Sequence, residues 1–101
     1  MPVAKVIQYK TKPEHAAENE NLIRQVFAEL AAHQPEGLSY ASFRLDDGVS
    51  FLHVATFDTD VNPLTASAAF AKFQSGIKER CVDGPGASDA AIIGSYRFLP
   101  E

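Results

Sequence analysis

Two β-prone stretches on either side of Asp47-Gly48 constrain the fold of this chain more than any other feature. They are LSYASFRL (38–45) and SFLHVATF (50–57). An Asp-Gly pair between such stretches favours a tight turn, so the sequence predicts an antiparallel hairpin. If Asp47-Gly48 is a two-residue turn, Asp46 pairs with Val49 and Ser42 faces His53. Opposed residues share a face of the sheet, which gathers Tyr40, Ser42, Arg44, Phe51, His53 and Phe57 on one side.

The segments around the hairpin complete an order of strands and helices. Residues 3–11, VAKVIQYKT, read as a strand, and apolar doublets at 22/23, 26/27 and 30/31 predict a helix over 14–33 that QPEG (34–37) ends. A second helical region starts at Asn62-Pro63, and Gly76 weakens its later turns. DGPGASD (83–89) reads as a loop and AAIIGSYRFL (90–99) as the last strand. One face of the second helical region carries Ala66, Ala69, Phe70, Phe73 and Ile77.

The order β-α-β-β-α-β predicts an α+β, ferredoxin-like fold over a single domain, residues 1–101. Two helices should cover one face of a four-stranded antiparallel sheet. Both faces of the strands carry apolar residues, however: Leu52 and Val54 oppose Phe51 and Phe57. A chain this short has no second cover of its own, so we expect a homodimer with the sheets facing each other, a dimeric α+β barrel.

Charge and composition exclude several kinds of partner. The net charge is −4, whereas nucleic-acid binding needs a basic field. The apolar runs are too short to span a bilayer, and the first ten residues make a poor signal peptide. A single cysteine, Cys81, fits a reducing compartment, so we expect a cytoplasmic protein. No cluster of Cys, His, Asp and Glu has the spacing of metal ligands, and we expect neither metal nor cofactor.

The hairpin running into FLHVATFDTD, followed by NPLTASAAFAKFQSGIKERC, resembles the antibiotic-biosynthesis-monooxygenase-like proteins of the dimeric α+β barrel superfamily. Ser67-Ala68-Ala69-Phe70 matches a Ser-x-x-Phe-type segment of that family. The resemblance implies a homodimer with ligand cavities between each sheet and its helices. It also implies cofactor-independent oxygenation of quinol- or anthrone-like aromatics, haem degradation, or no known reaction. Two departures count against the haem-degrading and quinol-oxidising activities: Phe57 stands where many members have Trp, and residues 62–65 lack a histidine.

His53 is the candidate catalytic base. The resemblance places Phe57 on the cavity side, and His53 shares its face, so a neutral imidazole there could take a proton from a phenol. The candidate substrate-binding residues are Tyr40, Ser42, Arg44, Phe57, Phe70, Phe73 and Tyr96. The alternative is a structural role for His53, with Ser42 opposite as its hydrogen-bond partner, which is the more common role of a histidine in a strand. Two other hypotheses are a non-catalytic or stress-related dimer that binds a small ligand, and a tautomerase that uses Pro2 as a base.

Overall fold

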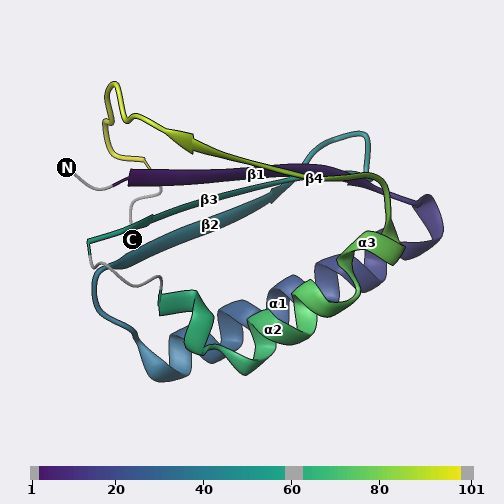
Figure 1. The fold of residues 1–101 in the computed structure, drawn as a ribbon, viewed down its shortest axis with the longest axis horizontal. Helices are drawn as coiled ribbons and strands as arrows, with labels where there is room; N and C mark the ends of the chain where they lie inside the picture. Colours follow the sequence, from purple (N-terminus) through teal and green to yellow (C-terminus); the bar gives the residue numbers. More distant parts are fainter. Residues whose placement is uncertain (1–2, 59–62, 99–101) are drawn as a thin grey trace.

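The computed structural model describes residues 3–58 and 63–98. Its strands pair in the order β2-β3-β1-β4, and every pairing is antiparallel. All the helices lie on one side of this sheet (Figure 1). The arrangement confirms the predicted ferredoxin-like α+β fold. The elements are β1 (Val3–Thr11), η1 (Pro13–His15), α1 (Ala16–His33), β2 (Leu38–Arg44), β3 (Ser50–Phe57), η2 (Pro63–Ala66), α2 (Ala68–Ser75), α3 (Ile77–Arg80) and β4 (Cys81–Ala90).

The hairpin has the predicted register but a different turn. Ser42 faces His53 and Arg44 faces Phe51, so the expected set of side chains does share one face. The corner of the turn is Asp46-Asp47, because the N–H of Gly48 donates to the carbonyl of Leu45 at 3.0 Å and Gly48 has a φ of +80°. The predicted Asp46–Val49 pair is therefore wrong. The register survives because the N–H of Leu45 donates to the carbonyl of Ser50.

The helices begin and end close to where the sequence placed them. α1 ends at Gln34, which adopts a left-handed conformation and donates its N–H to the carbonyl of Leu30. Ser67 caps α2, since its Oγ accepts from the N–H of Phe70 at 3.0 Å. The second helical region breaks at Gly76, as expected. A Cβ at this position would lie 3.0 Å from Nη1 of Arg80, so a glycine leaves room for the guanidinium.

The last strand was predicted wrongly. β4 spans Cys81–Ala90 and pairs with β1, whereas residues 91–98 form no strand and Ile93 is fully exposed. Leu99 lies outside the described residues. The register slips by one residue between Gln8 and Lys10, which leaves Gly84 and Pro85 at a bulge on the edge of the sheet. A bulge on an edge strand tolerates a proline that has no N–H to donate, and this is why a turn-like sequence can form β4.

The core fills the space between the sheet and the helices. The buried cluster consists of Tyr9, Ile23, Val26, Phe51, Leu64, Phe73 and Cys81. On the opposite face of the sheet, Val6, Phe43, Leu52 and Val54 are only partly buried. In the described ranges, no helix is long and apolar enough to cross a membrane. One face of the sheet is therefore packed and the other is open.

Candidate functional site

His53 lies on the helix-covered face of β3 and has a hydrogen-bond partner at each ring nitrogen. Nε2 is 2.7 Å from Oη of Tyr9, and Nδ1 is 2.7 Å from Oη of Tyr40 and 2.8 Å from Oγ of Ser42. The side chain is 2% exposed. Burial lowers the pKa of His53 from 6.5 to about 4, so the imidazole is neutral at neutral pH.

The hydrogen bonds continue from His53 into the core. Asn19 on α1 donates from Nδ2 to Oη of Tyr9 at 2.9 Å, and its Oδ1 accepts from Nε of Arg80 at 3.0 Å. Arg80 also donates from Nη2 to the carbonyl of Phe73 at 2.7 Å, and its guanidinium lies 5.3 Å from the centroid of that ring. Asn19 and Arg80 are 0% and 4% exposed. Burial raises the pKa of Tyr9, so its hydroxyl keeps its proton.

Sequence reasoning missed three members of this chain of hydrogen bonds: Tyr9, Asn19 and Arg80. One signal was present for Asn19, which lies four residues before Ile23 and so on the same apolar face of α1. Arg80 carried no signal, because an arginine in the last turn of a helix is ordinarily solvated. Only the packing of α3 under the sheet shows that it is buried.

A cavity of about 410 Å³ opens beside His53, between the sheet and the second helical region. Its polar residues include Tyr40 and His53, and the aromatic rings of Phe70 and Phe73 form part of its wall. Four of the predicted site residues therefore meet in one place. The complete lining is Ile7, Tyr40, His53, Phe70, Phe73, Gln74, Ile77, Pro85 and Ala87. We call this space the His53 cavity.

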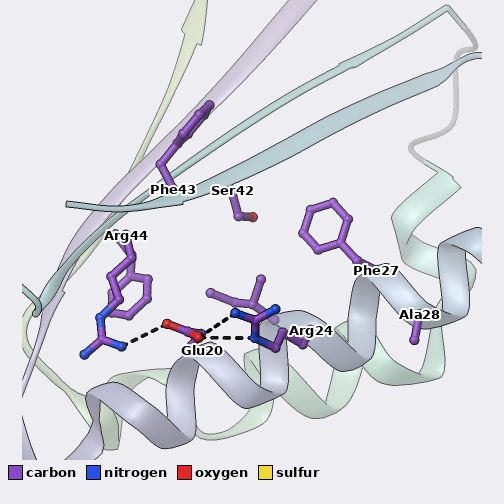
Figure 2. Close-up of a pocket in the computed structure, with 9 residues that line it drawn as sticks. Glu20, Arg24, Phe27, Ala28, Ser42, Phe43 and Arg44 are labelled. Atoms are coloured by element: carbon purple, nitrogen blue, oxygen red, sulfur yellow. Dashed lines mark hydrogen bonds and ion pairs between the residues drawn. The ribbon is translucent and has the colours of Figure 1, made fainter. Parts of the chain in front are cut away.

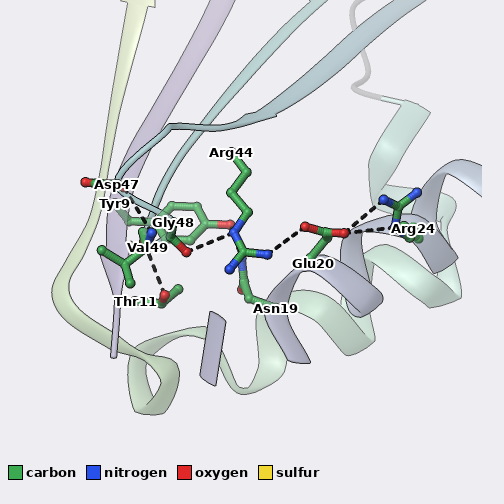
Figure 3. A network of polar contacts seen from close by, with 9 residues as sticks. All are labelled: Tyr9, Thr11, Asn19, Glu20, Arg24, Arg44, Asp47, Gly48 and Val49. Carbon is green, nitrogen blue, oxygen red and sulfur yellow. Dashed lines mark hydrogen bonds and ion pairs between the residues drawn. The ribbon is translucent and has the colours of Figure 1, made fainter. Parts of the chain in front are cut away.

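A second cavity, of about 560 Å³, lies between α1 and the β2–β3 hairpin (Figure 2). Arg44 is found here, with Nη1 donating to Glu20 at 2.9 Å and Nε donating to the carbonyl of Gly48 at 2.8 Å. Arg24 binds the same carboxylate, and the two guanidinium groups lower the pKa of Glu20. Figure 3 shows these ion pairs, and the side chains of Arg44 and Glu20 are about one third exposed. Arg44 therefore does not line the His53 cavity.

The remaining predicted residues are dispersed. Ser42 contacts His53 but lines the second cavity. Phe57, half-buried at the end of β3 opposite Leu38, lines neither cavity. Tyr96 is 81% exposed in the segment after β4, away from both cavities, because the last strand forms earlier than expected. Pro2 lies outside the described residues.

Ser67 has a structural role in the Ser-x-x-Phe segment. Besides capping α2, its hydroxyl donates to Oε2 of Glu29 at 3.2 Å. Glu29, on α1, also accepts from the N–H groups of Ala68 and Ala69, and these bonds lower the pKa of its carboxyl. The segment thus fixes the start of α2 against α1 and positions Phe70 at the cavity.

Comparison with solved structures supports this architecture. The protein Rv0793 from Mycobacterium tuberculosis superposes with a TM-score of 0.76 at 14% identity, over 94% of this chain and 98% of the other. A protein from Caulobacter crescentus proposed to be an antibiotic biosynthesis monooxygenase gives 0.72 at 18% identity, over 92% and 91%. A structure named antibiotic biosynthesis monooxygenase gives 0.68 at 15% identity, over 91% and 99%.

No protein-family model and no curated protein matches the sequence. The likeness is therefore one of fold, at low identity and over nearly the whole chain. It confirms the resemblance that the hairpin and the second helical region indicated: this chain has the fold of the antibiotic-biosynthesis-monooxygenase-like proteins.

Proposed function

We propose that this protein binds a small phenol-, quinol- or anthrone-type aromatic in the His53 cavity and supports its oxygenation by dioxygen without a cofactor. The observation that carries the proposal is the Tyr40–His53 pair, hydrogen-bonded at 2.7 Å in the wall of an aromatic cavity. A volume of about 410 Å³ falls in the range of small-ligand sites. The names of two of the similar structures support the choice of reaction.

The walls of the cavity favour a flat ligand with one oxygen at its edge. The rings of Phe70 and Phe73 lie 6.1 Å apart and can pack against an aromatic ring. Tyr40 then offers its hydroxyl to the ligand oxygen. Both nitrogens of His53 are already hydrogen-bonded, so the role we propose for His53 is indirect: it acts on the ligand through Tyr40.

The reaction needs no external reductant when the ligand carries a ring methylene. Loss of one proton from an anthrone gives an electron-rich anion, which dioxygen can oxidise. The two C–H bonds of the methylene are replaced by one C=O bond, and the second oxygen atom leaves as water. The cavity would contribute by orienting the ring and by stabilising the oxygen that carries the negative charge.

Dioxygen uptake with an anthrone tests the proposal. Tyr40→Phe removes only the hydroxyl and should reduce the rate at least tenfold, the effect expected when one hydrogen bond to a developing charge is lost. His53→Ala should also reduce the rate, because His53 acts on the ligand through Tyr40. Tyr96→Phe is the matched control, since this exposed hydroxyl lies outside the cavity. Unchanged uptake in Tyr40→Phe, with the fold intact, would refute the proposed site.

A second candidate function is ligand binding without turnover. The hydrogen bonds at both nitrogens of His53 favour it, because a satisfied, neutral imidazole is a poor base. Titration of an anthrone or a quinone into the protein under anaerobic and aerobic conditions separates the two functions. Saturable binding with no dioxygen uptake supports a binding protein, and measurable uptake excludes it.

We also propose that two chains associate through the open face of the sheet. The half-buried Val6, Phe43, Leu52 and Val54 form an apolar surface there, on the side away from the helices. Native mass spectrometry should find twice the mass of the chain, and Leu52→Glu should give a monomer. Asn21→Glu, a new charge at an exposed position of α1 on the other side of the sheet, is the control and should leave the association unchanged. A monomeric wild-type protein would refute this association.

A further inference from the structure

The buried hydrogen bonds that end at Tyr40 start at a group that can only donate. An arginine side chain has five N–H donors and no acceptor. Arg80 bonds to Asn19 through Nε, so the atom of Asn19 that it meets must be the carbonyl oxygen. The amide nitrogen of Asn19 is then the atom that faces Tyr9, and it donates to Oη at 2.9 Å. Arg80 thereby decides which way this amide is turned.

The bond from Asn19 also decides that the Tyr9 hydroxyl donates its proton to His53. Oη of Tyr9 accepts from Asn19, which leaves its single proton for Nε2 of His53, 2.7 Å away. If Nε2 were protonated instead, the hydroxyl proton of Tyr9 would have no acceptor among the described residues. Tyr9 is buried, and a buried hydroxyl without a partner is strongly disfavoured. Nε2 is therefore the acceptor.

A neutral imidazole with an unprotonated Nε2 carries its proton on Nδ1. That proton is donated to Oη of Tyr40 or Oγ of Ser42, at 2.7 and 2.8 Å. Since its oxygen faces a donor, Tyr40 directs its own proton away from His53. Of the two hydroxyls, that of Tyr40 belongs to a residue that lines the His53 cavity. Tyr40 also shares a hydrogen bond with Ser42, so its proton goes either to Oγ of Ser42 or, when a ligand is bound, to an accepting oxygen in the cavity.

We infer that Arg80 is a positioning residue that fixes His53 as the Nδ1–H tautomer and thereby makes Tyr40 a hydrogen-bond donor to the cavity. The cavity then selects ligands with an accepting oxygen, such as a phenolate or a quinone-type carbonyl, over the neutral phenol. The inference rests on the proposed function for the identity of the ligand, but not for the tautomer of His53. It follows that the site does not remove the phenol proton with His53; it favours the ligand that has already lost it.

Nitrogen-15 NMR of the His53 side chain tests the tautomer directly, with His53→Gln used to assign the signals among the three histidines. We expect the proton on Nδ1. In Asn19→Asp, the hydrogen bond between residue 19 and Tyr9 should reverse, because a carboxylate accepts from both Arg80 and the hydroxyl of Tyr9. Oη of Tyr9 must then accept from a protonated Nε2, and the tautomer should switch. Asn21→Asp adds the same charge on the same helix at an exposed position and should leave it unchanged.

A wild-type His53 with its proton on Nε2 overturns the inference, and this result needs no variant to fold. An Asn19→Asp protein that folds but keeps the Nδ1–H tautomer overturns it too. Arg80→Met gives a third readout: without the fixed donor the Asn19 amide can turn, and exchange between the two tautomers should appear. Retention of one sharp Nδ1–H signal in that variant would show that Arg80 does not set the direction.

Binding of 4-nitrophenol, whose anion absorbs visible light, tests the ligand preference. In the wild-type protein the bound dye should ionise more readily than the free dye by about tenfold, the equivalent of one hydrogen bond to a charged oxygen. Asn19→Asp should remove or reverse this shift. Tyr40→Phe should remove the shift in the ionisation of the dye. Nδ1 of His53 should stay protonated in this variant, because Oγ of Ser42 can still accept its hydrogen bond.

The two proposals fail in different ways in these experiments. A dye that binds without any change in its ionisation overturns the inferred selectivity, although the cavity still binds a phenol. A dye that does not bind, together with the expected tautomer switch, overturns the proposed function and supports the positioning role of Arg80.

Discussion

The buried His53 should make the stability of this protein depend on pH between about 4 and 6.5. In the folded state the pKa of His53 is lowered from 6.5 to about 4 by burial, so only the unfolded chain takes up a proton at this position between these two values. Stability attributable to His53 is complete above pH 6.5 and is lost as the pH falls toward the folded-state value.

The magnitude follows from the separation of the two values. Each pH unit between them costs about 1.4 kcal/mol of unfolding free energy per chain, or about 3 kcal/mol in total. From about pH 7 to about pH 5.5 the expected loss is about 1 kcal/mol, almost entirely from protonation of the unfolded chain. The hydrogen-bonded Glu20, Glu29 and Asp47 have lowered pKa values and stay ionised over this range, so they contribute little to it.

Urea denaturation at several pH values measures this slope. The comparison is with His53→Gln, which keeps a polar side chain at the position but does not titrate, so contributions from the rest of the chain cancel. Protein concentration must be constant, since association would shift the midpoints. The wild-type protein should lose about 1 kcal/mol more than the variant over this range. Equal slopes for the two proteins would refute a buried, neutral His53.

Three further predictions concern stability. Ser67→Ala should lower the unfolding free energy, measured from urea midpoints, by about 1 kcal/mol, because the Oγ that accepts from the N–H of Phe70 is lost. Ser67→Thr keeps a hydroxyl oxygen and should lower it by less. Equal midpoints for the two variants would contradict the helix cap. Phe51→Ala should cost about 3–5 kcal/mol, because the ring is fully buried in the core; a loss below about 1 kcal/mol would contradict that burial. Ile93→Ser should change the midpoint by less than about 0.5 kcal/mol, since Ile93 is fully exposed; a larger loss would show that another surface covers it.

The sequence predicted the central hairpin and the helices well because their signals are local. The register of β2 against β3 follows from a short connection and the two-residue period of strands, so Ser42 could be placed opposite His53 in advance. The apolar doublets of α1 and the weakening of the second helical region at Gly76 are also contained in a few neighbouring residues. The face of the hairpin that carries Tyr40 and His53 was therefore predictable.

The last strand shows where local signals failed. Residues 90–99 have the higher β-propensity, yet residues 81–90 pair with β1, starting directly after α3. Strand formation at this edge depends on backbone hydrogen bonds to β1. The bulge at Gly84-Pro85 allows a proline in the strand, although proline has no N–H to donate. The wrong strand also placed Tyr96 in the site, although it is exposed.

The sequence by itself determined the order of elements, the hairpin register and the presence of a histidine on the covered face, because these depend on spacing along the chain. Only the tertiary structure decided the chemistry around that histidine. Asn19 and Arg80 are 61 residues apart, and Tyr9 and His53 are 44 residues apart. No periodicity links such residues, and burial alone turns an ordinary helix-end arginine into the donor that orients the whole chain of hydrogen bonds.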